Sequence, residues 1–192
     1  MQIVLGSQSP RRKEVLQYFS LPFIQASPSF EEESIEFQGD PEQYVCDIAR
    51  GKAASLLHRF PQAIIITADT TVVCEGKVYN KPKDEQEACL VLSHLVGRWH
   101  TVYTGVTVRQ GHTEFFQAEG SRVLFNGLSF KQIQHYIAHS RWEDKAGGYS
   151  ILMAGGLLVR KIDGCYYNIT GLPLNALESL LKNFHIELWD YL

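Results

Sequence analysis

QIVLGSQSPRRKEVL, residues 2–16, has the residue order of a strand, a tight loop and the start of a helix. The apolar run Ile3–Leu5 predicts a buried strand, and Gly6 opens the loop. Ser9 and Pro10 then match the N-cap and the first position of a helix. A strand that ends where a helix begins is typical of α/β proteins.

The first turn of this predicted helix is suited to an anion, because its backbone N–H groups lack intrahelical partners and carry the positive end of the helix dipole. Arg11 and Arg12 lie in that turn, where cations are slightly unfavourable for the helix itself. Two guanidinium groups there indicate a ligand with phosphate oxygens. The alternative is a solvated helix start with two surface arginines, and the stretch alone does not decide between them.

The composition is that of an ordinary globular protein with local rather than global charge. The 192 residues include 18 Lys and Arg against 21 Asp and Glu, a formal charge of −3, so no basic field gathers nucleic acid. The four cysteines form no C-x-x-C pair, which argues against zinc and for reduced thiols. No apolar run approaches the ~20 residues of a membrane span, and we expect a cytoplasmic protein without membrane contact.

Periodicity and turn residues divide the rest of the chain into alternating elements. Strands are expected at 21–26, 63–68, 71–74, 78–79, 99–109, 114–124, 157–162 and 166–169. Helices are expected at 10–19, 40–58, 84–95, 129–139 and 171–184. The segments 27–39 and 141–156 lack clear periodicity and are expected to be irregular.

The most apolar and β-branched run, Ala63–Ala68, predicts a central strand buried on both faces. It ends in Asp69 and Thr70, and open α/β sheets place their chemistry at the carboxyl ends of such strands. A turn-starting aspartate is the alternative, but Thr71–Cys74 resumes the β pattern at once, which favours a functional Asp69. The hairpin that follows is expected to bring Lys81 back beside Asp69.

Three other segments hold candidate ligands. Lys52 lies in a predicted helix and is either an ordinary exposed lysine or a cation that reaches a phosphate; Gly51 beside it signals close packing. The glycine-rich 146–149 is a loop whose backbone approaches a ligand or another strand. An acidic run is either a solvated loop or the source of one carboxylate for a divalent cation: Glu31, Glu32, Glu33 and Glu36.

Seven short motifs, taken in order, resemble those of the Maf-like nucleoside triphosphate pyrophosphatases over essentially the whole chain. They are Ser7-x-Ser9-Pro10-Arg11-Arg12, an acidic pair ending at Glu32, Ala49-x-x-Lys52-Ala53, Ala68-Asp69-Thr70, Lys81-Pro82, Asp144-Lys145-Ala146-Gly147-x-Tyr149 and Gly171-Leu172-Pro173. Each motif is weak alone, but their common order is specific.

The resemblance implies a single domain over residues 1–192 with a two-lobed, mixed-sheet α/β fold similar to inosine triphosphate pyrophosphatases and an active site in the central cleft. It implies hydrolysis of a nucleoside triphosphate to a nucleoside monophosphate and pyrophosphate with a divalent metal ion, Mg²⁺ or Mn²⁺. It also implies a homodimer, for which the residues themselves give no interface signal.

The resemblance assigns roles to nine residues. The catalytic set would be Asp69, which would either accept a proton from water or act as a metal carboxylate beside that water, with Glu32, Lys52 and Lys81. Asp69 and Glu32 would also hold the metal ion. The substrate would contact Ser7, Arg11, Arg12, Thr70 and Leu152. Fixed cations opposite a polyanion are what phosphoryl chemistry requires on physical grounds as well.

Two residues resemble the branch of the family that acts on dTTP and UTP. They are Arg11, where the other branch has tryptophan, and Thr70 after the aspartate. Leu152 departs from that branch, which has glutamine at this position. If that glutamine contacts the base, its replacement by an apolar side chain should weaken discrimination between bases.

Two further classes of function remain as alternatives. A nucleotide-binding regulator of cell division or septum formation with little turnover would need binding but no paired carboxylates, so Glu32 with Asp69 favours an enzyme. A nucleic-acid-binding module is disfavoured by the negative charge and by the lack of a basic stripe interleaved with aromatic residues.

Overall fold

A computed structural model describes residues 2–192, and these form a mixed sheet of seven strands. The strand order is β2-β1-β3-β5-β6-β7, and β4 also pairs with β3. β1 is parallel to β2 and β3, and the other pairs are antiparallel. The strands are β1 Ile3–Gly6, β2 Ile24–Ala26, β3 Ile64–Cys74, β4 Lys77–Tyr79, β5 Trp99–Gln110, β6 Thr113–Phe125 and β7 Val159–Asp163. The expected mixed-sheet α/β fold is confirmed.

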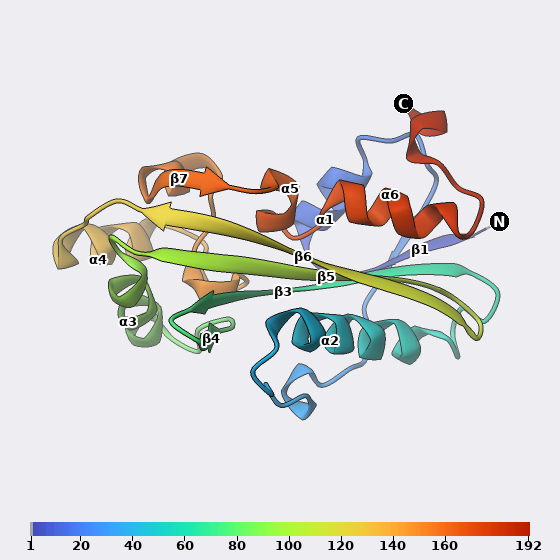
Figure 1. Ribbon diagram of the computed structural model, residues 1–192, viewed down its shortest axis with the longest axis horizontal. Coiled ribbons are helices and arrows are strands. Elements are labelled where there is room, and N and C mark those ends of the chain that lie inside the picture. The colour runs from blue at the N-terminus through green and yellow to red at the C-terminus, as the bar shows by residue number, and fades with distance from the viewer. Residues whose placement is uncertain (1) are drawn as a thin grey trace.

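Helices cover both faces of this sheet. Figure 1 shows the long strands β3, β5 and β6 running the length of the molecule between α2 on one side and α6 on the other. It also shows α3 and α4 grouped at one end, away from α1 and α6. The α-helices are α1 Pro10–Leu16, α2 Pro41–Leu56, α3 Glu85–Leu95, α4 Phe130–His139, α5 Tyr166–Ile169 and α6 Leu174–Lys182.

The helix starts follow local capping chemistry. The Asp40 carboxylate accepts hydrogen bonds from the backbone N–H groups of Glu42 and Gln43 at the start of α2. Ser129 and Gln132 form a reciprocal capping box at the start of α4. Because these interactions involve residues close in sequence, the predicted starts of both helices are confirmed.

Two hydrophobic cores lie side by side on one face of the sheet, one in each half, and two smaller clusters lie on the opposite face, against α2. In β3, Ile64, Ile66 and Ala68 belong to the core beneath α1 and α6, whereas Val72 and Cys74 belong to the core beneath α3 and α4. The two cores therefore meet along the short stretch of β3 between Ala68 and Val72. Thr70 shares this face of β3 and lies between the two cores, whereas Asp69 and Thr71 project from the opposite face, toward α2.

Two predictions about strands are wrong. β3 does not end at Ala68 but continues through Asp69, which pairs with Gly105 of β5, because the antiparallel β5 supports β3 along its whole length. Residues 166–169 are the helix α5 rather than a strand, since the buried Asn168 side chain donates to Val102 O and to Ser121 Oγ at 2.9 Å each. These contacts hold the segment against the sheet instead of pairing it with β7.

Two smaller differences lie near the first helix. α1 ends at Leu16, before the expected Phe19, and the strand predicted at 21–26 is confined to Ile24–Ala26. Among residues 2–192, no helix has the length and apolar character needed to cross a membrane.

Candidate active site

The site forms at a gap along one edge of β3. β1 pairs with β3 only as far as Leu5 opposite Ile66, and the pairing of β3 with β4 begins only at Val72, opposite Tyr79. Asp69 lies in the interval between these two partners. The carboxylate is therefore in the interior of a strand and yet faces a break in the sheet, where the chain leaves β1 to enter α1.

Close packing of α2 on the sheet brings a lysine to Asp69. A Cβ added to Gly105 would lie 2.6 Å from the backbone carbon of Val45, so α2 approaches β5 more closely than a side chain allows. Thr67 Oγ1 donates to Ala49 O at 2.7 Å and fixes the helix against β3. Lys52 follows on the same helix, and its side chain reaches the Asp69 carboxylate.

A second close contact brings in the acidic segment before α2. The ring of Phe30 lies against Gly51, where an added Cβ would come within 2.3 Å of it. The short 3₁₀ turn Glu32–Ser34 follows directly after this contact. The glycine that signalled close packing in the sequence thus makes room for the ring that holds Glu32 near the site.

Lys52 joins the two carboxylates. Its Nζ lies 2.6 Å from Asp69 Oδ1 and 2.8 Å from Glu32 Oε1, and the Lys52 and Asp69 side chains are each only 9% exposed. Lys81 Nζ lies 3.7 Å from the other oxygen of Glu32. The structure therefore brings together the four residues expected to be catalytic.

The cations determine the ionisation of Glu32. Burial alone would raise the pKa of Glu32, but the charge and hydrogen bond of Lys52, followed by the charges of Lys81 and Arg12, outweigh it and leave that pKa below its ordinary value. Glu32 is thus an anion at neutral pH.

Arg12 is a half-buried cation held by three acceptors. Its Nε donates to Gly171 O at 2.7 Å, one terminal nitrogen to Thr70 Oγ1 at 3.0 Å and the other to Ser7 Oγ at 3.3 Å. Burial lowers the pKa of the Arg12 guanidinium, and the charge of Asp69 opposes that shift. The side chain therefore connects β1, β3 and the segment before α6 at the centre of the site.

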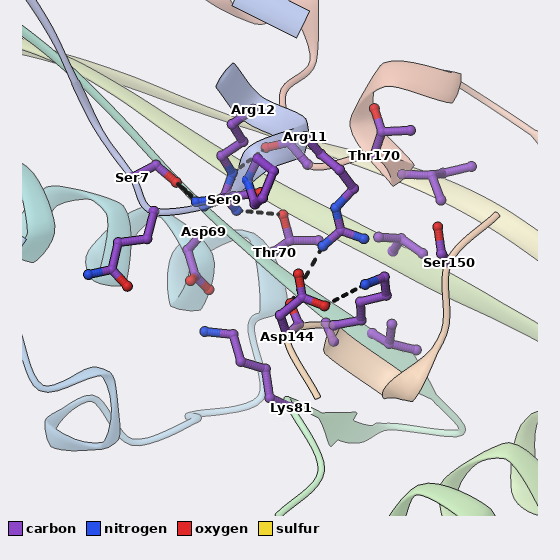
Figure 2. Close-up of a pocket in the computed structure, with 18 of the residues that line it drawn as sticks. Ser7, Ser9, Arg11, Arg12, Asp69, Thr70, Lys81, Asp144, Ser150 and Thr170 are labelled. Atoms are coloured by element: carbon purple, nitrogen blue, oxygen red, sulfur yellow. Dashed lines mark hydrogen bonds and ion pairs between the residues drawn. The ribbon is translucent and has the colours of Figure 1, made fainter. Parts of the chain in front are cut away.

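Arg11 has fewer protein contacts. One of its terminal nitrogens lies 3.5 Å from Asp144 O, and within residues 2–192 its buried Nε has no hydrogen-bond partner. Figure 2 shows Arg11 extending across the pocket toward Asp144, while Arg12 turns toward Ser7 and Thr70. The two neighbouring arginines thus have different surroundings, and Arg11 is the one with unused donors.

These side chains line a cavity of about 550 Å³ whose two ends differ in character. The charged end contains Arg12, Glu32, Lys52, Asp69 and Lys81. The other end contains Val72, Val102, Tyr149, Ser150, Ile151, Ile169 and Thr170, and the charged Arg11, Glu143, Asp144 and Lys145 complete the charged part of the lining. Figure 2 shows Asp69 and Lys81 on one side of Arg11, with Ser150 and Thr170 on the other. A ligand with an anionic tail and a flat, weakly polar head matches this division.

Tyr149 is fixed from behind by a buried histidine. Its hydroxyl lies 2.7 Å from His100 Nε2, and both rings contact Phe125 edge to face. Burial lowers the pKa of His100 to about 4 and raises that of Tyr149, so both side chains are neutral. His100 had no signal in the sequence, because its partner is 49 residues away.

Eight of the nine residues predicted for the site line the cavity, and Leu152 is outside its lining. The eight are Ser7, Arg11, Arg12, Glu32, Lys52, Asp69, Thr70 and Lys81. Sequence reasoning missed Ile169 and Thr170, because residues 166–169 were read as a strand remote from the site. Ile169 is the last residue of α5 and Thr170 follows it directly, and both residues line the cavity.

A divalent metal ion is compatible with the carboxylates at the charged end. Asp69 and Glu32 already face a common cation, the ammonium of Lys52, so their oxygens converge on one region. Mg²⁺ commonly takes one or two protein carboxylates and completes its shell with water and substrate phosphates. No group of three or more His, Cys, Asp or Glu side chains suited to a metal occurs in the described part of the chain. A metal here would therefore depend on ligands from the substrate.

Comparison with known proteins gives full-length matches. The model of a family described as "Maf-like protein" matches residues 2–184. A dTTP/UTP pyrophosphatase of Chlamydia caviae is 46% identical over 192 residues, covering 100% of this chain and 98% of that protein. A dTTP/UTP pyrophosphatase of Clostridium perfringens is 41% identical and covers 98% of this chain and 100% of its own.

Solved structures give weaker likenesses. The Staphylococcus aureus Ham1 protein is 12% identical, with a TM-score of 0.46 over 65% of this chain and 72% of its own. A nucleoside-triphosphatase, also described as a dITP/XTP pyrophosphatase, from Mycobacterium abscessus is 14% identical, with a TM-score of 0.40 over 65% of this chain and 74% of its own.

Proposed function

This chain belongs to the Maf-like protein family, and from that premise we propose that it hydrolyses dTTP and UTP to the nucleoside monophosphate and pyrophosphate. The observation that carries the proposal is the cluster of Asp69, Lys52 and Glu32 at the charged end of the cavity. A site for binding alone has no need of two carboxylates near a polyanion, since they repel it. Their presence among cations supports hydrolysis.

The first requirement of the reaction is to neutralise the triphosphate. Lys52, Lys81 and Arg12 supply fixed positive charges, and the Ser7 hydroxyl is a further group able to contact phosphate oxygens. Such groups act most strongly where negative charge develops on the leaving pyrophosphate. Arg12 is already positioned by three protein acceptors, so it needs no rearrangement when the substrate binds.

Asp69 is the group we propose as the acceptor of the water proton. The water oxygen attacks the α-phosphorus, the bond from that phosphorus to the bridging oxygen breaks, and pyrophosphate leaves with the bonding electron pair. The proton from water passes to Asp69. Lys52 orients one oxygen of Asp69, and no hydrogen bond within residues 2–192 occupies the other, which leaves it available to the water.

Asp69 and Glu32 would hold a divalent metal ion, Mg²⁺ or Mn²⁺. When bound, such an ion neutralises phosphate charge and acidifies coordinated water. The Lys52 ammonium lies between the same two carboxylates, so it would have to move away from at least one of them when the ion binds. Lys52 would then be free to contact the phosphates.

The apolar end of the cavity suits the base and sugar. Val72, Val102 and Ile169 offer surface for a planar ring, and Arg11 has a free guanidinium face at the boundary between the two ends. Arg11 is therefore our candidate for reading the base. Thr70 acts differently, since its hydroxyl contacts Arg12 and lies 2.9 Å from Thr104 Oγ1; we assign it to holding Arg12 in place.

We further propose that residues 1–192 act as one domain in the cytoplasm and that two copies assemble as a homodimer. These statements follow from the family resemblance. Gel filtration with light scattering tests the dimer, and a monomer at micromolar concentration would contradict it.

The proposed activity is tested by separating products on an anion-exchange column. The purified protein is incubated with dTTP, UTP, GTP or ATP in MgCl₂ or MnCl₂. We expect the monophosphate and pyrophosphate, most rapidly from dTTP and UTP. Release of a diphosphate and inorganic phosphate would contradict the assigned bond. Saturable binding without any product would favour the regulator of cell division.

A further inference from the structure

We propose that Asn80 is a positioning residue for the phosphate end of the cavity, acting through its neighbour Lys81 and through the glycine-rich loop at 146–149. The inference rests on the proposed function and adds to it a residue that itself need not touch the substrate. Asn80 follows the last residue of β4, where the chain turns back toward the site.

The Asn80 side chain joins two elements that carry site residues. Its Oδ1 accepts from Thr71 Oγ1 at 2.7 Å, and its Nδ2 donates to the Tyr44 hydroxyl at 3.0 Å. Thr71 lies in β3 two residues after Asp69. Tyr44 lies in α2 about two turns before Lys52. One amide therefore connects the strand that holds the acid to the helix that holds its lysine.

Both partners of this amide are themselves fixed. Thr71 is 0% exposed, and Tyr44 is 7% exposed with its ring edge to face against Phe37 at 5.6 Å. A buried hydroxyl that loses its hydrogen-bond partner is destabilised, which favours the connected arrangement. Asn80 itself lies at the surface, so its place is set by these two anchors rather than by burial.

The Asn80 backbone holds the glycine-rich loop. Asn80 O accepts from Gly147 N at 3.0 Å. A Cβ added to Gly147 would lie 3.0 Å from Val72 Cγ2, and one added to Gly148 would lie 3.1 Å from Pro82 Cγ. Both glycines also have positive φ. The loop is thus packed tightly against the segment around Asn80, so a shift of that segment also moves the loop.

Lys81 depends on this backbone more than its neighbours do. Its side chain is 55% exposed, and its nearest carboxylate oxygen, Glu32 Oε2, is 3.7 Å away. By contrast, Lys52 is buried between two acids. A long exposed side chain has many rotamers, so the position of its Cα largely determines which phosphate its ammonium can reach.

A second hollow of about 290 Å³ adjoins the main cavity beside Asn80. Tyr44, Asn80 and Lys81 line it together with Glu32 and Asp69. The amide therefore borders the charged end directly. A misplacement of about 1 Å at a catalytic group can reduce the rate about a hundredfold, which sets the upper limit of the effect expected here.

The test is a double-mutant cycle between Asn80→Ala and Lys81→Ala, assayed with UTP and Mg²⁺. We expect Asn80→Ala to lower kcat/KM about tenfold or more in the wild-type background. In the Lys81→Ala background, Asn80→Ala should lower kcat/KM by less than about threefold, because the main effect of Asn80 passes through Lys81. Equal effects in both backgrounds would overturn the inference.

A matched control and two gentler variants complete the test. Gln110→Ala also removes an amide that joins two segments, Nε2 to Gln62 O at 3.0 Å, but it lies outside the cavity. Its effect should be small and equal in both backgrounds. Thr71→Ser should retain activity that Thr71→Val loses. If Asn80→Ala fails to fold, the cycle is run with Tyr44→Phe in its place. Tyr44→Phe should then lower kcat/KM in the wild-type background and have little effect in the Lys81→Ala background.

Binding separates this inference from the proposed function. The affinity for a UTP analogue with a non-hydrolysable α–β bridge is measured by calorimetry for all four proteins of the cycle. If the wild type proves inactive but binds the analogue, the proposed function fails. The inference then stands only if Asn80→Ala weakens binding at least fivefold in the wild-type background and not in Lys81→Ala.

Discussion

The ammonium of Lys52 in α2 lies 2.6 Å from Oδ1 of Asp69 in β3, the next element along the chain. Both side chains are almost completely buried, and Glu32 Oε1 lies 2.8 Å from the same ammonium. The lysine thus occupies the position between two carboxylates that a metal ion would also use.

Lys52→Met is expected to strengthen binding of Mn²⁺ in the absence of nucleotide by tenfold or more. Removing the unit charge of Lys52 about 4 Å from the divalent ion relieves a repulsion of up to ~8 kcal/mol at an effective dielectric constant of 20. Calorimetric titration with MnCl₂ measures the change. Lys81→Met is the control, because Lys81 is exposed and contacts only Glu32. Equal affinities in the wild type and Lys52→Met would place the metal elsewhere.

Asp69→Asn is expected to lower kcat by about 10²–10⁴, the usual contribution of a positioned base. The amide has the same shape, so nucleotide affinity should change little. Steady-state kinetics with UTP and calorimetry with the non-hydrolysable analogue measure the two quantities. Asp47→Asn makes the same chemical change outside the cavity, where Asp47 pairs with Arg50, and should leave turnover intact. Full turnover by Asp69→Asn would remove this residue from catalysis.

Arg11→Ala and Arg12→Ala are expected to fail in different ways. Arg12 makes three hydrogen bonds to protein acceptors, so its loss should lower the thermal midpoint and reduce turnover of every nucleotide alike. Arg11 has an unpartnered Nε among the described residues, so its loss should leave stability unchanged and alter the UTP-to-GTP ratio of kcat/KM about tenfold. An unchanged ratio in Arg11→Ala would contradict its assignment to the base.

His100 is expected to make stability depend on pH between about 6.5 and 4. Burial lowers the pKa of His100 to about 4, so in this range the unfolded chain binds a proton that the folded protein rejects. The free energy of unfolding is therefore full above pH 6.5 and falls as pH drops, by roughly 3 kcal/mol at 1.36 kcal/mol per pKa unit.

Urea unfolding at pH 7.5, 6 and 5 measures this effect. The carboxylate of Glu32 has a lowered pKa, so its contribution is retained above the ordinary pKa of a glutamate and is lost only at more acidic pH. Comparison with His100→Gln isolates the histidine. The variant should start from a lower stability and show a flatter pH dependence; parallel curves would show that His100 is not the titrating group.

Leu152→Gln is expected to change the preference among UTP, dTTP and GTP by less than about threefold. Leu152 lies outside the cavity lining and precedes Met153, which is 98% exposed. Competition assays with pairs of nucleotides measure the ratio. Ser150→Ala is the comparison, because Ser150 does line the apolar end. A tenfold gain in discrimination by Leu152→Gln would mean that the loop moves to the base when substrate binds.

Much of the fold could be predicted where local chemistry decides it. The caps Asp40 and Ser129 mark their helices because the groups that bond lie within three residues of each other. The turn Glu75-Gly76 marks its hairpin through two residues with positive φ. By contrast, the prediction of a strand at 166–169 is wrong. The helix α5 forms there because Asn168 contacts Val102 and Ser121, which are far away in the chain and leave no local signal.

The candidate site shows the same division. Motif order indicated Glu32, Lys52, Asp69 and Lys81, and all four line the charged end of the cavity. The sequence did not indicate His100 behind Tyr149 or Asn80 between Thr71 and Tyr44, since these are pairwise contacts between segments that only the fold brings together.

The sequence by itself determined the helix starts, the apolar character of the strands, the family and the residue types available for phosphate chemistry, because each depends on neighbouring residues or on a pattern along the chain. Only the tertiary structure decided that Asp69 lies inside a continuous strand and nevertheless lines the cavity. The reason is that the pairing of β3 with β1 ends before it and the pairing with β4 begins after it, leaving one stretch of the β3 edge without a partner. It also decided that Lys52 is buried between two acids, since that depends on how closely α2 packs on Gly105 and Phe30 on Gly51.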